Sequence, residues 1–144
     1  MLTESDRAIL DENYHSCVMG TQAINTLIHK VTDEKLALEL NREACKCTNL
    51  ARKVTDKLAM EYETPGGESV NKAMLWTELQ LQTLKNASNE HVAELMIQRN
   101  AMAVTDLMKV VKANKSARKD YCELAEEIMD FHEKCIENLK SYLK

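Results

Sequence analysis

Apolar residues recur at steps of three and four along most of the chain, which is the spacing of one face of an α-helix. In the first run, Leu10, Tyr14, Cys17, Thr21 and Ile24 follow one another at alternating steps of four and three, so they are expected on the buried face. The pattern predicts five helices, over about 4–31, 33–62, 69–86, 89–113 and 116–143. A short turn joins the first two helices and another joins the last two, so each pair is expected to form an antiparallel hairpin.

Residues that favour helix starts and loops mark the boundaries. Thr3, Thr32 and Ser88 each precede a helical run and can cap its free amide groups. Acidic residues in the first turns add to the signal because they interact favourably with the positive end of the helix dipole. The stretch 64–67, Thr-Pro-Gly-Gly, is the only cluster of proline and glycine and predicts the clearest loop.

Two hairpins of long helices make a four-helix bundle with an additional connecting helix, folded as one domain over 1–144. Residues 63–88 decide its topology. A separate helix there could climb back along the bundle as a crossover, whereas one kinked helix over 69–113 would give a plain up-down-up-down bundle. We favour a break near 86–88, and the pattern leaves the crossover open.

Composition supports the all-α class and excludes several functions. The 144 residues include three glycines, one proline and 4% aromatics, too few for the turns and strands of a β protein. The net charge of −4 argues against a nucleic-acid binder. No uncharged apolar run approaches the roughly 20 residues that span a membrane. The acidic start lacks an export signal, and the five cysteines are expected as free thiols in the cytoplasm.

Chemical motifs are sparse. Helical bundles that bind two metal ions carry a Glu-x-x-His pair on each of two helices, but this chain has the single match Glu12–His15, which is expected to point outward. No glycine-rich phosphate loop or nucleophile motif is present. We therefore assign no catalytic residue, no metal ligand and no cofactor.

Weaker candidates remain for a buried polar or ligand-binding site. These are Glu43, Asn100 and His132. Asn100 falls close to the buried face of its helix, where it needs a hydrogen-bond partner or a ligand. His132 lies beside the buried face of the last helix, and the ordinary interpretation is a histidine bonded at the edge of the core. Among the thiols, Cys45 is the candidate reactive one, since it falls on a flank of its helix beside basic residues.

An apolar surface is expected on the connecting helix. Leu75, Trp76 and Leu79 make the segment 69–86 apolar on more than one side. A helix surrounded by water would not show this pattern, so the segment packs in a groove or meets a second subunit. We take these three residues as the candidate interface of a homodimer.

Three stretches carry a resemblance to a known family. They are the positions Tyr14, Cys17, Gly20 and Ile24, the segment 76–84 (WTELQLQTL) and the segment 93–98 (AELMIQ). Together they resemble ferritin-like bundles of endospore-forming bacteria, some of which are grouped with spore coat protein F. The resemblance implies a ferritin-like fold, often dimeric, with a structural or interaction role in coat-type members. It supplies no catalytic residues.

Two hypotheses follow from the sequence. The first is a non-enzymatic ferritin-like bundle that acts through protein contacts, as a homodimer. The alternative is a degenerate metal-binding or redox bundle in which Glu43, Asn100, His132 and Cys47 converge at the middle of the bundle, although they are distant in sequence.

Overall fold

The computed structural model describes residues 1–66 and 88–143, and all regular structure within them is helical. The long helices are α1 (Glu4–Leu27), α2 (Glu34–Met60), α4 (Asn89–Ala113) and α5 (Lys119–Leu139), with single 3-10 turns η1 (Ile28–Lys30) and η2 (Lys140–Tyr142). The all-α prediction and its two hairpins are confirmed. The predicted helix over 69–86 lies outside the described residues. None of the helices that the structure describes combines the length and apolar character of a membrane-spanning segment.

Two of the three predicted N-caps are confirmed. The Thr3 hydroxyl accepts from the Asp6 amide while the Asp6 carboxylate accepts from the Thr3 amide, each at 3.0 Å. Ser88 Oγ accepts from the His91 amide at 3.1 Å. The prediction for Thr32 was wrong by one residue, because the carboxylate of Asp33 reaches two free amides of the first turn of α2, at 2.8 and 3.1 Å.

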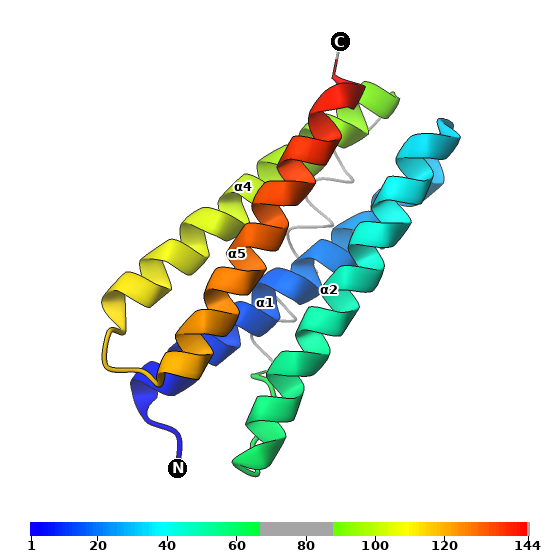
Figure 1. Ribbon diagram of the computed structural model, residues 1–144. Coiled ribbons are helices and arrows are strands. Elements are labelled where there is room, and N and C mark those ends of the chain that lie inside the picture. Colours follow the sequence, from blue (N-terminus) through cyan, green and yellow to red (C-terminus); the bar gives the residue numbers. More distant parts are fainter. Residues whose placement is uncertain (67–87, 144) are drawn as a thin grey trace.

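Contacts at the two ends of the bundle fix the direction of each helix (Figure 1). At one end, Arg7 near the start of α1 donates to the Thr64 carbonyl at 2.7 Å, so α2 ends beside the N-terminus. At the other end, the Asn89 side chain accepts from the Thr32 amide at 2.9 Å, so α4 begins beside the turn between α1 and α2. Hence α1 and α5 run one way and α2 and α4 the other. Residues 64 and 89 lie at opposite ends of the bundle, which excludes a plain up-down-up-down topology.

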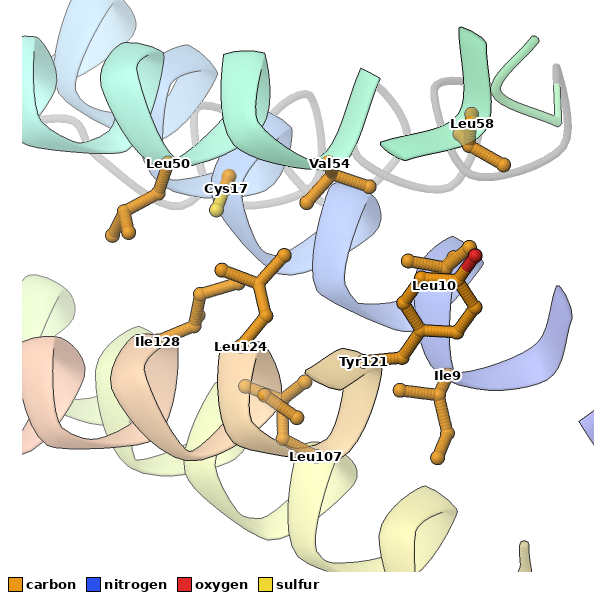
Figure 2. Packing of buried hydrophobic residues seen from close by; sticks show 11 residues of the cluster. Ile9, Leu10, Cys17, Leu50, Val54, Leu58, Leu107, Tyr121, Leu124 and Ile128 are labelled. Atoms are coloured by element: carbon orange, nitrogen blue, oxygen red, sulfur yellow. The ribbon is translucent and has the colours of Figure 1, made fainter. Parts of the chain in front are cut away.

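Two apolar clusters fill the interior. The first apolar cluster lies towards the N-terminal end and contains Ile9, Leu10, Cys17, Leu50, Val54, Leu58, Leu107, Tyr121, Leu124, Ala125 and Ile128. Figure 2 shows its α2 side chains facing those of α5, with α1 beside them. The second apolar cluster lies at the other end and contains Ala23, Ile24, Leu27, Leu36, Leu40, Val92, Leu95, Met96 and Leu139. All four helices contribute to both clusters.

The buried face of α1 is rotated from the predicted one. Tyr14, expected in the core, is only half-buried, whereas Asn13 and Ser16 are buried at 0% and 2% exposure. The helix packs against α2, α4 and α5 and therefore buries a broader face than a single line of apolar residues indicates. Asn13 Nδ2 donates to the Tyr121 carbonyl at 3.4 Å, and Ser16 Oγ donates to the Asn13 carbonyl at 3.1 Å. Asn13 thus links α1 to α5, while its Oδ1 has no hydrogen-bond partner among the described residues.

Asp6 ties the start of α1 to the turn that precedes α5. Its side chain is 3% exposed and accepts from the Arg118 amide at 2.8 Å as well as from Thr3. Burial on its own would raise the pKa of Asp6, but the hydrogen bonds from Arg118 and Thr3 outweigh it and hold the pKa below the ordinary value. Asp6 is therefore an ionised acceptor that joins the two hairpins.

We expect Asp6→Ala to lower the free energy of unfolding by roughly 2–3 kcal/mol, because two backbone amides lose a charged acceptor. Urea unfolding followed by circular dichroism measures this change. The exposed first-turn variant Glu4→Ala is the control and is expected to cost under about 0.5 kcal/mol. Since Asp6 has a lower pKa folded than unfolded, its contribution is lost as the pH falls through the folded pKa. Equal losses in the two variants would contradict the assignment.

Candidate functional site

A buried polar layer crosses the bundle where the two apolar clusters meet. We define it as Ser16 of α1, Glu43 and Cys47 of α2, Arg99 and Asn100 of α4, and His132 and Cys135 of α5. All seven residues are less than 5% exposed. On α2 the layer lies between Leu40 of the second apolar cluster and Leu50 of the first, and on α5 it lies between Ile128 and Leu139. Each of the four helices thus turns a polar group inward at the same level.

Arg99 is the only described residue that brings a permanent charge into this layer, and it is 0% exposed. Its Nη2 donates to the Ser16 carbonyl at 3.0 Å, while Nε and Nη1 have no hydrogen-bond partner among the described residues. Burial lowers the pKa of Arg99, although the neighbouring thiols of Cys47 and Cys17 act in the opposite direction. A guanidinium stays protonated in a protein, so the layer contains a positive charge that pairs with no carboxylate of the described residues.

Gly20 provides space for this arrangement. A Cβ atom at position 20 would lie 2.9 Å from Cys47 Sγ and 3.6 Å from Arg99 Nη2. The first distance is shorter than a carbon–sulfur van der Waals contact, so a side chain at this position would push Cys47 away. The absence of a side chain on Gly20 lets α1 approach both α2 and the guanidinium closely.

Asn100 and His132 form a direct pair. Asn100 Nδ2 donates to the Met96 carbonyl at 2.8 Å, which leaves Asn100 Oδ1 as the acceptor for His132 Nδ1 at 2.8 Å. His132 therefore carries its proton on Nδ1, and its buried Nε2 has no partner among the described residues. Burial, with a further effect of the Arg99 charge, lowers the pKa of His132 to about 3. The imidazole is neutral at physiological pH.

Glu43 lies at the edge of the layer where it meets the groove between α2 and α5. The side chain is 4% exposed, and neither carboxyl oxygen has a hydrogen-bond partner in the described part of the chain. Burial raises the pKa of Glu43 to about 8, with the nearby Cys135 thiol acting against this effect and Glu39 adding to it. Glu43 is therefore predominantly a neutral carboxylic acid at pH 7.

The buried thiols are also protonated. Burial raises the pKa of Cys47 to about 12, although the Arg99 charge acts in the opposite direction. Burial likewise raises the pKa of Cys17 and Cys135 above the ordinary range of a thiol. Nucleophilic chemistry and metal ligation need the thiolate, so these thiols are unreactive in the folded state. Cys45 is exposed on α2, away from the layer, as its position on a helix flank predicted.

The candidates from the sequence are brought together only in part. Asn100 and His132 are bonded, and Glu43 shares the layer with them without a hydrogen bond to either. Leu75, Trp76 and Leu79 lie outside the described residues. Within 1–66 and 88–143, no group of three or more His, Cys, Asp or Glu side chains is placed to hold a metal ion.

Sequence reasoning missed Arg99, although a signal existed. Arg99 stands three residues after Met96 and four before Ala103, both of which are buried, so the helical period places it at the centre of the inward face. A charged residue at such a position is normally assigned to the surface.

Comparison with family models, with curated proteins and with solved structures finds no match to this chain.

The pH dependence of stability tests the protonation states of the layer. Folding takes up a proton on Glu43 between its ordinary pKa of 4.5 and the folded value of about 8, so stability falls as the pH rises through this window. His132 has the opposite sign. Its folded pKa of about 3 lies below the ordinary 6.5, so stability falls as the pH drops below 6.5.

We expect Glu43→Gln to gain stability relative to the wild type as the pH rises from 5 to 8, by at most about 1.4 kcal/mol per pH unit. His132→Gln is expected to lower stability at pH 7 and to flatten the loss of stability between pH 6 and 4. Urea unfolding at a series of pH values measures both effects. A Glu43→Gln variant that parallels the wild type between pH 5 and 8 would contradict the protonation of Glu43.

Proposed function

We propose that this chain is a ferritin-like helical bundle that acts through contacts with other proteins and catalyses no reaction. The observation that carries the proposal is the state of the polar layer. Burial keeps the Cys47 thiol protonated and lowers the pKa of His132 to about 3, so these groups supply neither a thiolate nucleophile nor a strong base. We therefore place the function of the bundle on its surface.

The helix directions support the ferritin-like part of the proposal. In ferritin-like bundles one long crossover connects two helical hairpins. Here α2 and α4 run in the same direction, and the connection from 64 to 89 begins and ends at opposite ends of the bundle. A structural role like that of spore coat proteins is the function that the resemblance to that family adds. The five free thiols fit a reducing cytoplasm.

A homodimer is the form in which we propose that the bundle acts. The support is the apolar pattern of the segment 69–86, where Leu75, Trp76 and Leu79 give more apolar surface than one buried face requires. Dimers with two-fold symmetry are the commonest assemblies of soluble proteins, and in them the same surface of each subunit meets itself.

We expect the wild type to elute as a dimer of about 33 kDa, twice the chain mass of 16.4 kDa, in size-exclusion chromatography with light scattering. The double variant Trp76→Ala, Leu79→Ala is expected to elute as a monomer, because its interface loses most of its apolar area. The matched control is Met102→Ala, Met108→Ala, which truncates two exposed apolar residues of α4 and is expected to remain dimeric. A monomeric wild type would overturn the dimer, and a monomeric control would move the interface to α4.

A second candidate function is a degenerate metal-binding or redox bundle. One observation favours it, namely that Glu43, Cys47, Asn100 and His132 come from three helices and all lie in the polar layer. The buried charge of Arg99 counts against it, because a guanidinium at the same level repels a divalent cation.

Elemental analysis of untagged protein, grown in medium supplemented with iron and zinc, distinguishes the two candidates. We expect no metal above background in the wild type, since the protonated groups of the layer would have to release protons against the Arg99 charge. The informative variant is Arg99→Met, which removes the charge and keeps an apolar stem. About one metal atom per wild-type chain, lost in His132→Ala, would establish the metal-binding bundle.

A further inference from the structure

The groove between α2 and α5 is built differently at its two ends. Towards the N-terminal end of the bundle, Lys53 of α2 pairs with Glu127 of α5 at 2.6 Å, and Lys57 pairs with Asp120 at 3.4 Å. These pairs cross the groove, where Lys53, Lys57 and their partners line a hollow of about 440 Å³ together with Asp56, Met60, Glu123 and Leu124. Figure 1 shows the two helices side by side along this length.

At the level of the polar layer the same groove contains a hollow of about 230 Å³. Its walls are Glu39, Arg42, Glu43 and Lys46 on α2 and Phe131, Lys134, Cys135 and Asn138 on α5. No ion pair between described residues crosses the groove here. Arg42 pairs with Glu39 on its own helix at 3.2 Å, whereas Lys46 and Lys134 form no ion pair with any described residue.

Among the described residues that line the hollow, the unpaired charges are therefore positive. Arg42 and Glu39 cancel, and Lys46 and Lys134 remain as two cations on opposite walls. The inner wall carries the carboxyl group of Glu43, of which only 4% is exposed. Neither of its oxygens has a hydrogen-bond partner among the described residues. Phe131 and Cys135 give the rest of this wall an apolar character. Two cations, one buried carboxyl group and an apolar surface thus face the same space.

We propose that this hollow binds a small carboxylic acid, with its carboxylate between Lys46 and Lys134 and within reach of the Glu43 hydroxyl, and with its apolar body against Phe131. A carboxylate accepts from ammonium groups and from a protonated carboxyl group, so it satisfies the three polar groups together. An amine would meet two lysines of its own charge. A phosphate dianion needs more donors than the apolar wall offers.

The volume sets the size of the ligand. Since a water molecule takes about 30 Å³ of liquid, a hollow of about 230 Å³ holds roughly eight non-hydrogen atoms. Hexanoate has this size and carries one carboxylate on an unbranched apolar chain. The inference uses neither the proposed dimer nor a metal, because it rests on the described residues that line the hollow, and Arg99 is not among them.

Isothermal titration calorimetry of the full chain with hexanoate at pH 7 tests the proposal. We expect saturable binding of one molecule per chain, with a Kd on the order of 0.1–1 mM. Hexylamine, 1-hexanol and inorganic phosphate are expected to bind at least tenfold more weakly. Failure of hexanoate to saturate, or equal binding of the amine, the alcohol or phosphate, would overturn the carboxylate assignment.

Two sets of variants locate the site. Lys46→Gln with Lys134→Gln is expected to weaken hexanoate at least tenfold. The matched control Lys112→Gln with Lys115→Gln removes the same charge from exposed positions outside the hollow and is expected to bind as the wild type does. Both pairs lie on the surface, and an unchanged unfolding transition establishes that each variant is folded. Equal weakening by the two pairs would reduce the effect to net charge and overturn the site.

Glu43 gives a readout that surface charge cannot produce. Raising the pH from 7 to 9 ionises Glu43, whose pKa is about 8, and places a second carboxylate against the ligand. The charged and titratable groups near Glu43 are Glu39, Arg42, Lys46 and Cys47 on α2 and Lys134 and Cys135 on α5, with Arg99 of α4 behind Cys47. We expect the affinity of the wild type for hexanoate to fall over this range, and that of Glu43→Gln to stay constant. A parallel fall in both proteins would overturn the contact with Glu43.

Discussion

A buried positive charge in the middle of the bundle is the constraint on which the rest of the interior depends. Moving an ion out of water costs several kcal/mol even after the protein has relaxed around it. Among the described residues, a hydrogen bond to the Ser16 carbonyl offsets part of this cost, and electrostatic interactions with Cys47, Cys17, Cys135 and Asp106 also favour the charged form of Arg99. The close approach needs Gly20, since a Cβ there would collide with Cys47. The absence of a side chain at Gly20 therefore lets Cys47 and Arg99 lie where they do.

The charge of Arg99 also determines what its neighbours can do. It favours the neutral form of His132, whose Nδ1–H is already committed to Asn100. Arg99 acts to lower the pKa of Cys47, but burial raises it by more and keeps the thiol protonated. A divalent metal would add a second positive charge at the same level. Among the described residues, the layer is thus a set of neutral polar groups around one cation, and hydrogen bonds within it link α4 to α1 and to α5.

Most of the fold could be predicted from the sequence because its signals are periodic. Apolar spacing located all four described helices, and cap residues such as Thr3 and Ser88 located two of their starts. The remaining differences have local causes. Asp33 replaces Thr32 as the cap because its carboxylate reaches two amides, while the Thr32 amide is taken by Asn89 from another helix. The direction of each helix depends on such long-range contacts, and the spacing of apolar residues along the sequence does not predict them.

The polar layer was less predictable than the helices, for a physical reason. Periodicity indicates which face of a helix is buried, but sequence reasoning assigns charged residues to the outside of that face. Asn100 and His132 could be noticed because the apolar spacing places each close to the buried face of its helix, whereas Arg99 was overlooked although it lies at the centre of one. Its burial follows from partners on α1, α2 and α5, which are far away in sequence. A charged side chain at an inward position is thus a signal of a polar layer. The signal can be interpreted only when the polar groups of the neighbouring helices are known.

The groove between α2 and α5 is where this interior comes closest to the surface. Glu43 and Cys135 belong to the polar layer and also line the hollow, and the ring of Phe131 lies 5.3 Å from that of His132, centroid to centroid. Towards the N-terminal end of the bundle, lysine–carboxylate pairs join the two helices across the groove. At the level of the hollow, neither acidic residue of α2 pairs with a lysine across the groove. Glu43 is buried in the core, and Glu39 pairs with Arg42 on its own helix. Lys46 and Lys134 therefore have no carboxylate partner among the described residues. Core packing does not explain this, because an ion pair at this level would stabilise the bundle in the same way as the pairs of Lys53 and Lys57.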